Sequence, residues 1–499
     1  MKLNATKIPI RVGKKYIAVL NEKRAHFLDL HAGDRVILKK SRVPSIRAIL
    51  EITDNSELKE TEIGLYEETW DKLKIDNYGE DIEIGIAKKP ISTTYIKEKL
   101  NGKRLDAKKI NEIIKDVVNE DLSDIEVAYF VSGCYVHGLS DKETANLTRA
   151  IVKNGSQIKF GNRIVADKHC IGGVPGNRTT MIIIPIITAA GIIMPKTSSR
   201  AITSPSGTAD TMEVLANITN DAPKLKKIAQ KAGGFITWGG GVDLASADDK
   251  MIKARHPLSL DPQGMLLASI MAKKFSVSSN HVLIDIPVGP QVKIKTKKEG
   301  RILKRRFETL GKYLGMKIKV IFSNGDQPIG NGIGPSLEAI DVLKTLKNES
   351  DAPQELREKS IMMAGLLLEL CGKARKTRGK VMARKILDSG KAYEQMMKII
   401  KAQGAKRTKL RPGKFSKIIR AGKNGQVVGI NNKLIAHIAR TAGAPKDAEA
   451  GVYLHKKIGA IVTKGEPLYA IYADIEERLG YTSQYPLNKA YTINSAKRP

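Results

Sequence analysis

Apolar β-rich runs alternate with helical segments from Arg163 onward, and this alternation restricts the fold more than any other feature of the sequence. Strands separated by helices predict one parallel sheet that is covered by helices on both faces. We expect strands at 164–166, 192–195, 235–238, 282–288 and 316–322, and helices over 180–190, after Thr208 and after Gln263. Ligands of such sheets bind at the carboxyl ends of the strands. The loops that follow the strands are therefore where we expect the chemistry.

The segments on either side of this region have different patterns. Short β-branched runs at 8–12, 16–20 and 35–38 predict a small β-rich domain that ends near Pro90. Short strands after residue 418 predict a second one. Between 92 and 152, two capping boxes, Ser123-x-x-Glu126 and Ser140-x-x-Glu143, mark helix starts. Another helix there has a buried face formed by Ile110, Ile113, Ile114, Val117 and Val118.

These patterns predict a multidomain α+β and α/β fold. A helical domain and a parallel-sheet α/β domain are flanked by small β-rich domains at the amino and carboxyl ends. The expected bounds are 1–87 for the amino-terminal domain, 88–160 for the helical domain (with later helices), 161–410 for the α/β phosphate- and nucleotide-binding domain, and 411–499 for the carboxy-terminal domain.

Composition excludes several classes of protein. The longest apolar stretch, 181–195, contains Pro185 and is shorter than the roughly 20 residues of a membrane span. The amino terminus has no apolar signal core. The cysteines, Cys134, Cys170 and Cys371, lie far apart, which predicts neither disulfides nor a structural zinc site. We expect a cytoplasmic protein without a metal and without membrane association.

The balance of 85 basic and 52 acidic residues gives a net charge of +33. Such a charge attracts polyanions and phosphorylated small molecules alike. Aromatic residues make up only 5% of the chain, and base-stacking modules need more of them. We therefore expect no specific nucleic-acid partner, although a basic RNA-binding protein remains the alternative of another class.

The first candidate loop is Asp167-Lys168-His169-Cys170-Ile171-Gly172-Gly173-Val174-Pro175-Gly176-Asn177, placed between a strand and a helix. Glycines let backbone N–H groups approach an anion, the helix amino terminus adds partial positive charge, and Lys168 adds a full one. A tight strand-to-helix turn without function explains the glycines equally well. His169 and Cys170 are adjacent in the chain, so they do not suggest a nucleophile and its base.

The second candidate loop, Lys196 to Thr208, follows the next strand and opens the next helix. Its hydroxyl side chains and the planar guanidinium of Arg200 suit phosphate oxygens. A solvated Ser/Thr loop capped by Thr208 is the structural alternative. Two such loops after consecutive strands favour anion binding.

Other segments carry weaker signals. Asp261 precedes Pro262 and fits a helix N-cap. Ser269 and Lys273 share a helix face, which lines a pocket or borders solvent. Glycine-rich runs occur at 239–241 and 325–334, and Lys293 follows a predicted strand. Each of these is compatible with a purely structural role.

Together these segments resemble the thymidine/AMP phosphorylase family. The matching stretches are DKHCIGGVPGN (167–177), PKTSSRAITSPSGTADTMEVL (195–215), SLDPQGMLLASIMAKK (259–274) and QPIGNGIGPSLEA (327–339). The similarity extends from about Ile91 to the carboxyl end. Cys170, where the pyrimidine enzymes usually have serine, and the domain before residue 87 are similar to the nucleotide-specific branch.

The resemblance implies a helical domain hinged to an α/β domain, with substrates bound in the cleft between them. It implies phosphorolysis of AMP, and of CMP and UMP as further candidates, by inorganic phosphate as a substrate without a cofactor. It also implies a homodimer or larger homo-oligomer. Asp261 would protonate the departing base, and Lys168 would assist phosphate binding. Contacts to AMP or phosphate would come from Gly173, Ser199, Arg200, Ala201, Ile202, Thr203, Ser204, Thr208, Ser269 and Lys293.

The residues suit this chemistry. Phosphorolysis builds positive charge on the sugar while the base departs with electrons, so a carboxylic acid at the base lowers the barrier. Backbone donors and hydroxyls can hold the attacking phosphate. A pyrimidine nucleoside phosphorylase would share the fold and reaction but would not need a site for the 5′-phosphate. The sequence leaves open which loop holds which phosphoryl group.

Overall fold

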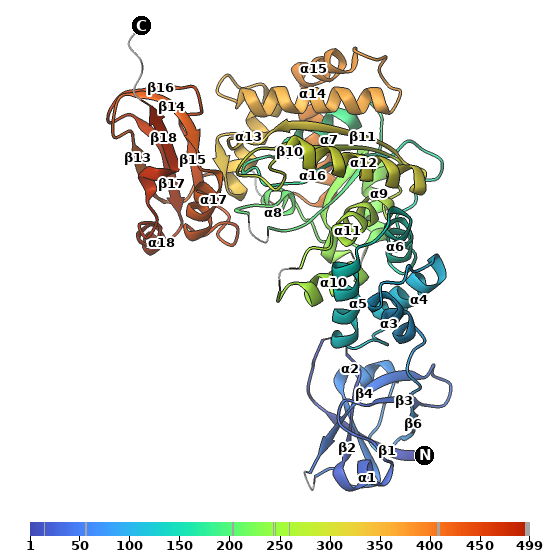
Figure 1. The fold of residues 1–499 in the computed structure, drawn as a ribbon. Helices are drawn as coiled ribbons and strands as arrows, with labels where there is room; N and C mark the ends of the chain where they lie inside the picture. The colour runs from blue at the N-terminus through green and yellow to red at the C-terminus, as the bar shows by residue number, and fades with distance from the viewer. Residues whose placement is uncertain are drawn as a thin grey trace. The chain divides into compact units, whose positions relative to one another are not determined.

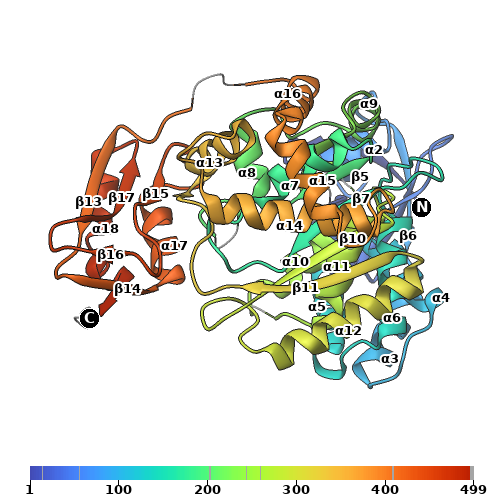
Figure 2. The same ribbon diagram turned by 90° about the horizontal axis from the view of Figure 1, so that it is seen from above.

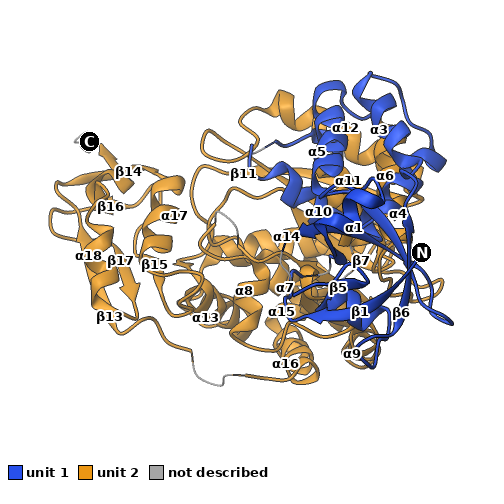
Figure 3. Cartoon of the chain, turned by 90° about the horizontal axis from the view of Figure 1, so that it is seen from below, with its two compact units in different colours: residues 1–139, 247–265 blue, residues 140–246, 266–499 orange. Residues whose placement is uncertain are grey.

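The computed structural model describes residues 1–13, 15–54, 57–201, 204–242, 244, 246–258, 260–406 and 410–494. The chain runs through 18 strands and 18 α-helices in these residues (Figure 1). It forms two compact units, coloured separately in Figure 3. The first unit contains residues 1–139 and 247–265, and the second contains residues 140–246 and 266–499. Each unit is described by itself.

The first unit begins with a closed barrel of six strands in the order β1-β5-β2-β4-β3-β6. The strands are β1 (Lys2–Ile8), β2 (Ile17–Asn21), β3 (Arg35–Lys39), β4 (Ile46–Thr53), β5 (Glu62–Tyr66) and β6 (Asp81–Ile86), with the short helices α1 (Glu22–Phe27) and α2 (Glu67–Lys72) between them. The first strand ends at Ile8, whereas the sequence predicted a strand over 8–12. Leu3 and Ala5 alternate into the barrel core, and this two-residue period selects the earlier segment.

Besides α1 and α2, the first unit contains the helices α3 (Ser92–Leu100), α4 (Ala107–Val118), α5 (Asp124–His137) and α10 (Ser246–Arg255). Ile110, Ile113, Ile114 and Val117 form the buried face of α4, as their spacing predicted, whereas Val118 is only half-buried. The capping box of Ser123 and Glu126 begins α5, again as predicted. The second predicted capping box, Ser140 with Glu143, begins α6 (Asp141–Lys153), which belongs to the second unit.

The α/β part of the second unit contains two small parallel sheets, whereas the sequence predicted one continuous sheet. The strands β7 (Ala166–Cys170), β10 (His281–Val288) and β11 (Lys317–Asn324) pair in the order β11-β10-β7. The strands β8 (Met194–Ser198) and β9 (Gly234–Trp238) pair with each other. A parallel bridge between Val165 and Ile193 joins the two sheets just before β7 and β8. The bridge places the amino ends of β7 and β8 side by side.

Helices cover both faces of the three-stranded sheet. Val282, Ile284 and Ile286 of β10 pack with α12 (Lys297–Leu314), whereas Leu283 packs with α7 (Thr179–Ala189) and α14 (Gln354–Leu370). Figure 2 shows α12 and α14 on opposite sides of β10 and β11. Further helices are α8 (Thr208–Glu213), α9 (Ala222–Ala232), α11 (Gln263–Phe275), α13 (Pro335–Lys347), α15 (Gly379–Asp388) and α16 (Lys391–Gln403), with a 3₁₀ turn at Gly239–Gly241.

The chain ends in a β-rich region of the second unit with its own core around Val452, Leu454 and Tyr469. One sheet has the order β12-β15-β17-β13 and the other β16-β14-β18. Their elements are β12 (Gly332–Ile333), β13 (Phe415–Arg420), β14 (Gly425–Ile430), α17 (Asn432–Thr441), β15 (Gly451–Leu454), β16 (Ile461–Val462), β17 (Pro467–Ala473), α18 (Glu476–Thr482), a 3₁₀ turn at Leu487–Ala490 and β18 (Tyr491–Asn494). No helix within the described part of the chain is long and apolar enough to cross a membrane.

Candidate active site

The first candidate loop leaves the sheet at the end of β7. The strand extends to Cys170, so Asp167 and Lys168 lie within it, whereas the sequence predicted that the strand ends at Ala166. The loop proper begins with Gly172 and Gly173, at φ +95° and +98°. A Cβ atom at Gly173 would lie 3.0 Å from the backbone nitrogen of Lys293. The fold thus places two of the predicted contact residues, Gly173 and Lys293, next to each other.

The second candidate loop runs from Ser199 to the start of α8 at Thr208. The Asp210 carboxylate holds it closed by accepting hydrogen bonds from the backbone nitrogens of Ala201 at 2.7 Å and Gly207 at 2.8 Å. The Ser204 hydroxyl donates to the Ser206 carbonyl at 3.1 Å. Ser199 and Ser204 are both exposed. Ile202 and Thr203, which were also predicted to contact the substrate, lie outside the described residues.

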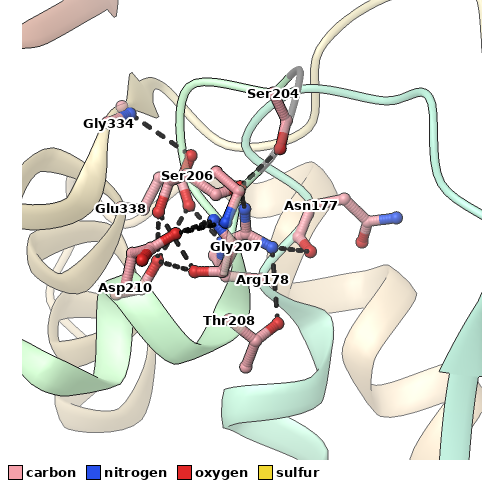
Figure 4. Close-up of polar contacts among 12 residues, drawn as sticks. Asn177, Arg178, Ser204, Ser206, Gly207, Thr208, Asp210, Gly334 and Glu338 are labelled. Atoms are coloured by element: carbon pink, nitrogen blue, oxygen red, sulfur yellow. Dashed lines mark hydrogen bonds and ion pairs between the residues drawn. The ribbon is translucent and has the colours of Figure 1, made fainter. Parts of the chain in front are cut away.

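Arg178, at the end of the first loop, connects the two loops (Figure 4). Its Nη2 atom donates to the Ser206 carbonyl at 2.5 Å, and Nη1 lies 3.4 Å from the Thr208 hydroxyl. Nη1 also donates to the Asn177 carbonyl at 3.2 Å, and Nε pairs with the buried carboxylate of Glu338. Both candidate loops are therefore fixed to one guanidinium group.

Arg200 of the second loop is held by acidic neighbours. Its guanidinium pairs with Glu213 and lies 3.3 Å from Asp210, and it stacks 5.0 Å from the ring centre of Trp238. The hydrogen bond with Glu213 raises the pKa of Arg200 and lowers the pKa of Glu213. A phosphoryl group that binds Arg200 would therefore share it with these carboxylates or displace them.

Buried charges lie beneath the loops, in the strands that carry them. The Asp167 carboxylate pairs with Lys196 of β8 at 3.0 Å and with Lys274 of α11 at 2.9 Å. Burial alone would raise the pKa of Asp167, but the two ammonium groups outweigh it and lower that pKa. Burial lowers the pKa of Lys274 to about 7. One carboxylate is thus held between two lysines directly under the loops.

Lys168 lies in the same layer and is 1% exposed. Its ammonium donates to the Thr179 hydroxyl at 2.8 Å, which donates to the Asn177 side-chain oxygen at 3.1 Å. Burial lowers the pKa of Lys168. Its contact with the start of α7 places its charge behind the first loop, and direct phosphate binding by Lys168 stays a prediction.

His169 and Cys170 offer no charged nucleophile or acid near neutral pH. Burial, together with Lys274, Lys196 and Lys168, lowers the pKa of His169 well below 6.5. Burial raises the pKa of the Cys170 thiol, whose sulfur accepts a hydrogen bond from Asn177 at 3.4 Å. In the described residues no group of three or more His, Cys, Asp or Glu side chains is placed to hold a metal ion.

Helix α11 places Ser269 and Lys273 beside β8. Ser269 is 5% exposed, and the Lys273 ammonium lies 3.3 Å from its hydroxyl oxygen. The Thr197 hydroxyl, at the end of β8, donates to the Lys273 carbonyl at 3.2 Å. The pair is thus attached to the strand that leads into the second loop.

Asp261 lies in the first unit, two residues before α11. Its side chain is 60% exposed and pairs with Arg255 at 2.9 Å. The predicted N-cap position falls on Pro262 instead, because the helix begins at Gln263. Its role as proton donor stays a prediction.

The sequence analysis missed Arg178, Asp210 and Glu338. Asp210 had a partial signal, because an acidic residue three positions after a helix cap can accept a hydrogen bond from the cap nitrogen, as Asp210 does from Gly207 here. Arg178 and Glu338 are 160 residues apart in the chain. The pairing of two residues so far apart cannot be predicted from a local sequence pattern.

Comparison with known proteins agrees with this architecture. Residues 93–155 match the helical bundle domain of a glycosyl transferase family, residues 162–261 match the a/b domain of that family, and residues 426–494 match the pyrimidine nucleoside phosphorylase C-terminal domain. Anthranilate phosphoribosyltransferase from Thermus thermophilus has a similar fold, with a TM-score of 0.53 at 16% identity over 62% of this chain and 98% of that one.

Curated relatives cover nearly the whole chain. AMP phosphorylase of Methanococcoides burtonii is 41% identical over 96% of this chain and 94% of its own length. AMP phosphorylase 1 of Archaeoglobus fulgidus is also 41% identical, over 100% of this chain and 97% of its own length. With the helical and a/b glycosyl transferase domains and the two joined loops in place, the chain belongs to the AMP phosphorylase family.

Proposed function

We propose that this protein catalyses the phosphorolysis of AMP by orthophosphate, yielding adenine and α-D-ribose 1,5-bisphosphate. The bond between the base nitrogen and C1′ of the ribose breaks, and a bond from a phosphate oxygen to C1′ forms. The electron pair of the broken bond leaves with the base, which takes up a proton. Both the identity of the relatives and the site geometry support this reaction.

The observation that carries the proposal is the link that Arg178 makes between the two loops. The reaction needs two phosphoryl groups at opposite ends of one ribose, the 5′-phosphate and the attacking orthophosphate. Two loops rich in backbone and hydroxyl donors, held together by hydrogen bonds to Ser206 and Thr208, suit that need. A nucleoside phosphorylase would use only one such loop for phosphate.

The buried charges support catalysis by electrostatics. Lys196 and Lys274 hold Asp167 in a rigid buried network behind the loops, and groups held rigidly require no reorganisation when the reaction occurs. Substrate contacts are assigned to Gly173, Ser199, Arg200, Ala201, Ile202, Thr203, Ser204, Thr208, Ser269 and Lys293. The chemistry requires no metal and no organic cofactor, since orthophosphate is itself a substrate.

Asp261 is proposed as the group that protonates the departing base. The ion pair with Arg255 favours the ionised carboxylate, so this role requires Asp261 to leave Arg255 and take up a proton when the substrate binds. Protonation of a leaving group by a positioned acid contributes roughly 10²–10⁴-fold to a rate.

A pyrimidine substrate is the second candidate, because residues 426–494 match the pyrimidine nucleoside phosphorylase C-terminal domain. The deciding experiment incubates purified protein and orthophosphate with AMP, CMP, UMP and the three matching nucleosides, and measures free base. We expect phosphate-dependent adenine release from AMP and little from adenosine. Release from the nucleosides alone would favour the second candidate, and no base from any substrate would refute both.

A homo-oligomer is proposed from the surface of α5. Ile125, Tyr129 and Val136 are 68%, 54% and 71% exposed, and their spacing of four and seven residues places them on one face of the helix. An exposed apolar stripe of this kind typically marks a surface that a partner protein covers. A second copy of the chain is the partner we propose.

A cytoplasmic location is proposed because Cys134, Cys170 and Cys371 are all free thiols.

A further inference from the structure

A glycine-rich segment, residues 327–334, lies between the first loop and the β-rich carboxy-terminal region. On the carboxy-terminal side its strand β12 pairs with β15. The Leu454 backbone nitrogen donates to the Asn331 carbonyl at 2.8 Å, and the Ile458 nitrogen donates to the Gln327 side chain at 2.9 Å. The carboxy-terminal region thus holds both ends of the segment.

The other side of the segment contacts the first loop directly. The Ile329 backbone nitrogen donates to the Pro175 carbonyl at 3.0 Å. Gly176, at φ +68°, approaches so closely that a Cβ atom there would lie 2.3 Å from the Ile329 carbonyl oxygen. Any shift of Ile329 would therefore move Pro175 and Gly176, and with them the anion-binding turn at Gly173.

Lys457 fixes the part of the segment that makes this contact. Its ammonium donates to the carbonyl of Pro328 at 2.6 Å and to the carbonyl of Gly330 at 2.5 Å, the two residues that flank Ile329. The next turn is held from within the α/β part, because the Asp341 carboxylate accepts hydrogen bonds from the nitrogens of Asn331 at 2.6 Å and Gly332 at 2.7 Å.

Stability alone does not account for a lysine in this place. Burial lowers the pKa of Lys457 to about 8, which means that the charged form loses solvation there. The desolvation of an ammonium group offsets much of what its hydrogen bonds contribute. Strand pairing through β12 and β15 already attaches the region. What Lys457 adds is a defined position for two carbonyl groups.

We propose that Lys457 is a positioning residue that sets the geometry of the first phosphate-binding loop through the glycine-rich segment. This role rests on the proposed function, because it acts on substrate binding. The carboxy-terminal region then contributes to the active site without touching the substrate.

The test compares Lys457→Met with Lys456→Met in the full-length protein. Lys456 is adjacent and pairs with Glu466 at 2.5 Å within the carboxy-terminal region, so its variant removes the same charge without touching the segment. Steady-state kinetics with AMP and orthophosphate give KM and kcat for each. Gly173→Ala, measured in parallel, identifies the substrate whose phosphoryl group the first loop holds.

We expect Lys457→Met to raise the KM of the substrate that Gly173→Ala affects by about tenfold, with a smaller effect on kcat and on the other KM. Lys456→Met should behave as wild type, and Lys457→Arg should recover most of the loss because its donors can reach both carbonyls. Wild-type KM values in Lys457→Met, or equal losses in the two methionine variants, would overturn the proposal.

Folding and function are controlled separately. Thermal unfolding shows whether Lys457→Met is folded. If Lys457→Met is unfolded, Lys457→Gln replaces it, and we expect an intermediate KM because the amide NH₂ group can still donate. If wild-type protein releases no adenine, the proposed function fails. Calorimetric binding of AMP and of orthophosphate to wild type, Lys457→Met and Lys456→Met then decides whether Lys457 positions the loop.

Discussion

Single buried polar residues determine the shape of the site. Arg178 is 11% exposed at its side chain, and its partner Glu338 is 1% exposed. Burial raises the pKa of Glu338 even though Arg178 opposes this. Glu338 also accepts hydrogen bonds from Thr211 and from the Gly334 nitrogen. The pair thus connects both candidate loops to the start of α13.

Replacing Arg178 should separate stability from activity. Arg178→Met leaves the Glu338 carboxylate buried without its cation, which costs about 3–5 kcal/mol. The double variant Arg178→Met, Glu338→Gln removes both charges and should recover much of that loss, yet remain inactive because the loops are no longer joined. Chemical unfolding and AMP phosphorolysis measure the two effects. Recovery of activity in the double variant would contradict the role of Arg178 as the link.

Asp261→Asn tests the proton donor. We expect kcat for AMP to fall about 10²- to 10⁴-fold with little change in KM, since the amide cannot deliver a proton. Arg255→Met is the control, because it breaks the same ion pair while keeping the carboxyl group. If both variants lose the same modest activity, Asp261 serves only the ion pair.

Asp341 should make stability depend on pH. It is 3% exposed, and burial raises its pKa from 3.8 to about 6. Between these values the folded chain holds a proton that the unfolded chain has released, so stability falls as pH rises through this window. Asp341→Asn keeps an acceptor for the Asn331 and Gly332 nitrogens and removes this effect. The difference in unfolding free energy between variant and wild type should grow by about 2 kcal/mol from pH 4 to pH 7. A constant difference would disprove the assignment.

At the scale of elements, features set by neighbouring residues were predicted correctly, whereas a strand end set by distant residues was predicted wrongly. Both predicted capping boxes begin helices, at Ser123 and Ser140, because a cap is satisfied within four residues. The end of β7 was predicted too early, because charged residues rarely lie inside a strand. Asp167 does so here because Lys196 and Lys274, from two other elements, neutralise it.

The first loop depends on a backbone conformation that favours glycine. Gly173→Ala should weaken binding of one substrate at least tenfold, because alanine is strained at φ +98° and its Cβ would meet Val292 and Lys293 at 3.0 Å. Gly161→Ala is the matched control, since Gly161 has φ +67° and nothing within 4 Å of a Cβ. KM for AMP and orthophosphate measures the effect. Equal changes in both variants would attribute it to backbone strain alone.

At the scale of the whole molecule, the parallel sheets bring together segments that are distant in the sequence. The first loop, the second loop and Lys293 come from three separate parts of the chain, and the hydrogen bonds of Arg178 to the Asn177 and Ser206 carbonyls join the first two. The carboxy-terminal region adds Lys457 behind them.

Assembly can be tested on α5. Ile125→Lys with Tyr129→Lys should convert the proposed homo-oligomer into a monomer, because two desolvated ammonium groups oppose burial of this face. Phe27→Lys, at a residue that is 76% exposed elsewhere in the first unit, should leave the mass unchanged. Light scattering after size-exclusion chromatography gives the mass. An unchanged mass in the double variant would exclude α5 as the interface.

The sequence by itself determined the fold class and the position of the two loops, because periodicity, glycine content and hydroxyl-rich runs are local properties. The family came from the resemblance of whole stretches, and the substrate contacts of Gly173 and Lys293 stay predictions. Only the tertiary structure decided that Arg178 joins the loops, that Asp167 is buried among lysines, and that Lys457 reaches the glycine-rich segment. These residues contact partners far away in the chain, and a buried charge is favourable only where the fold brings its partner to it.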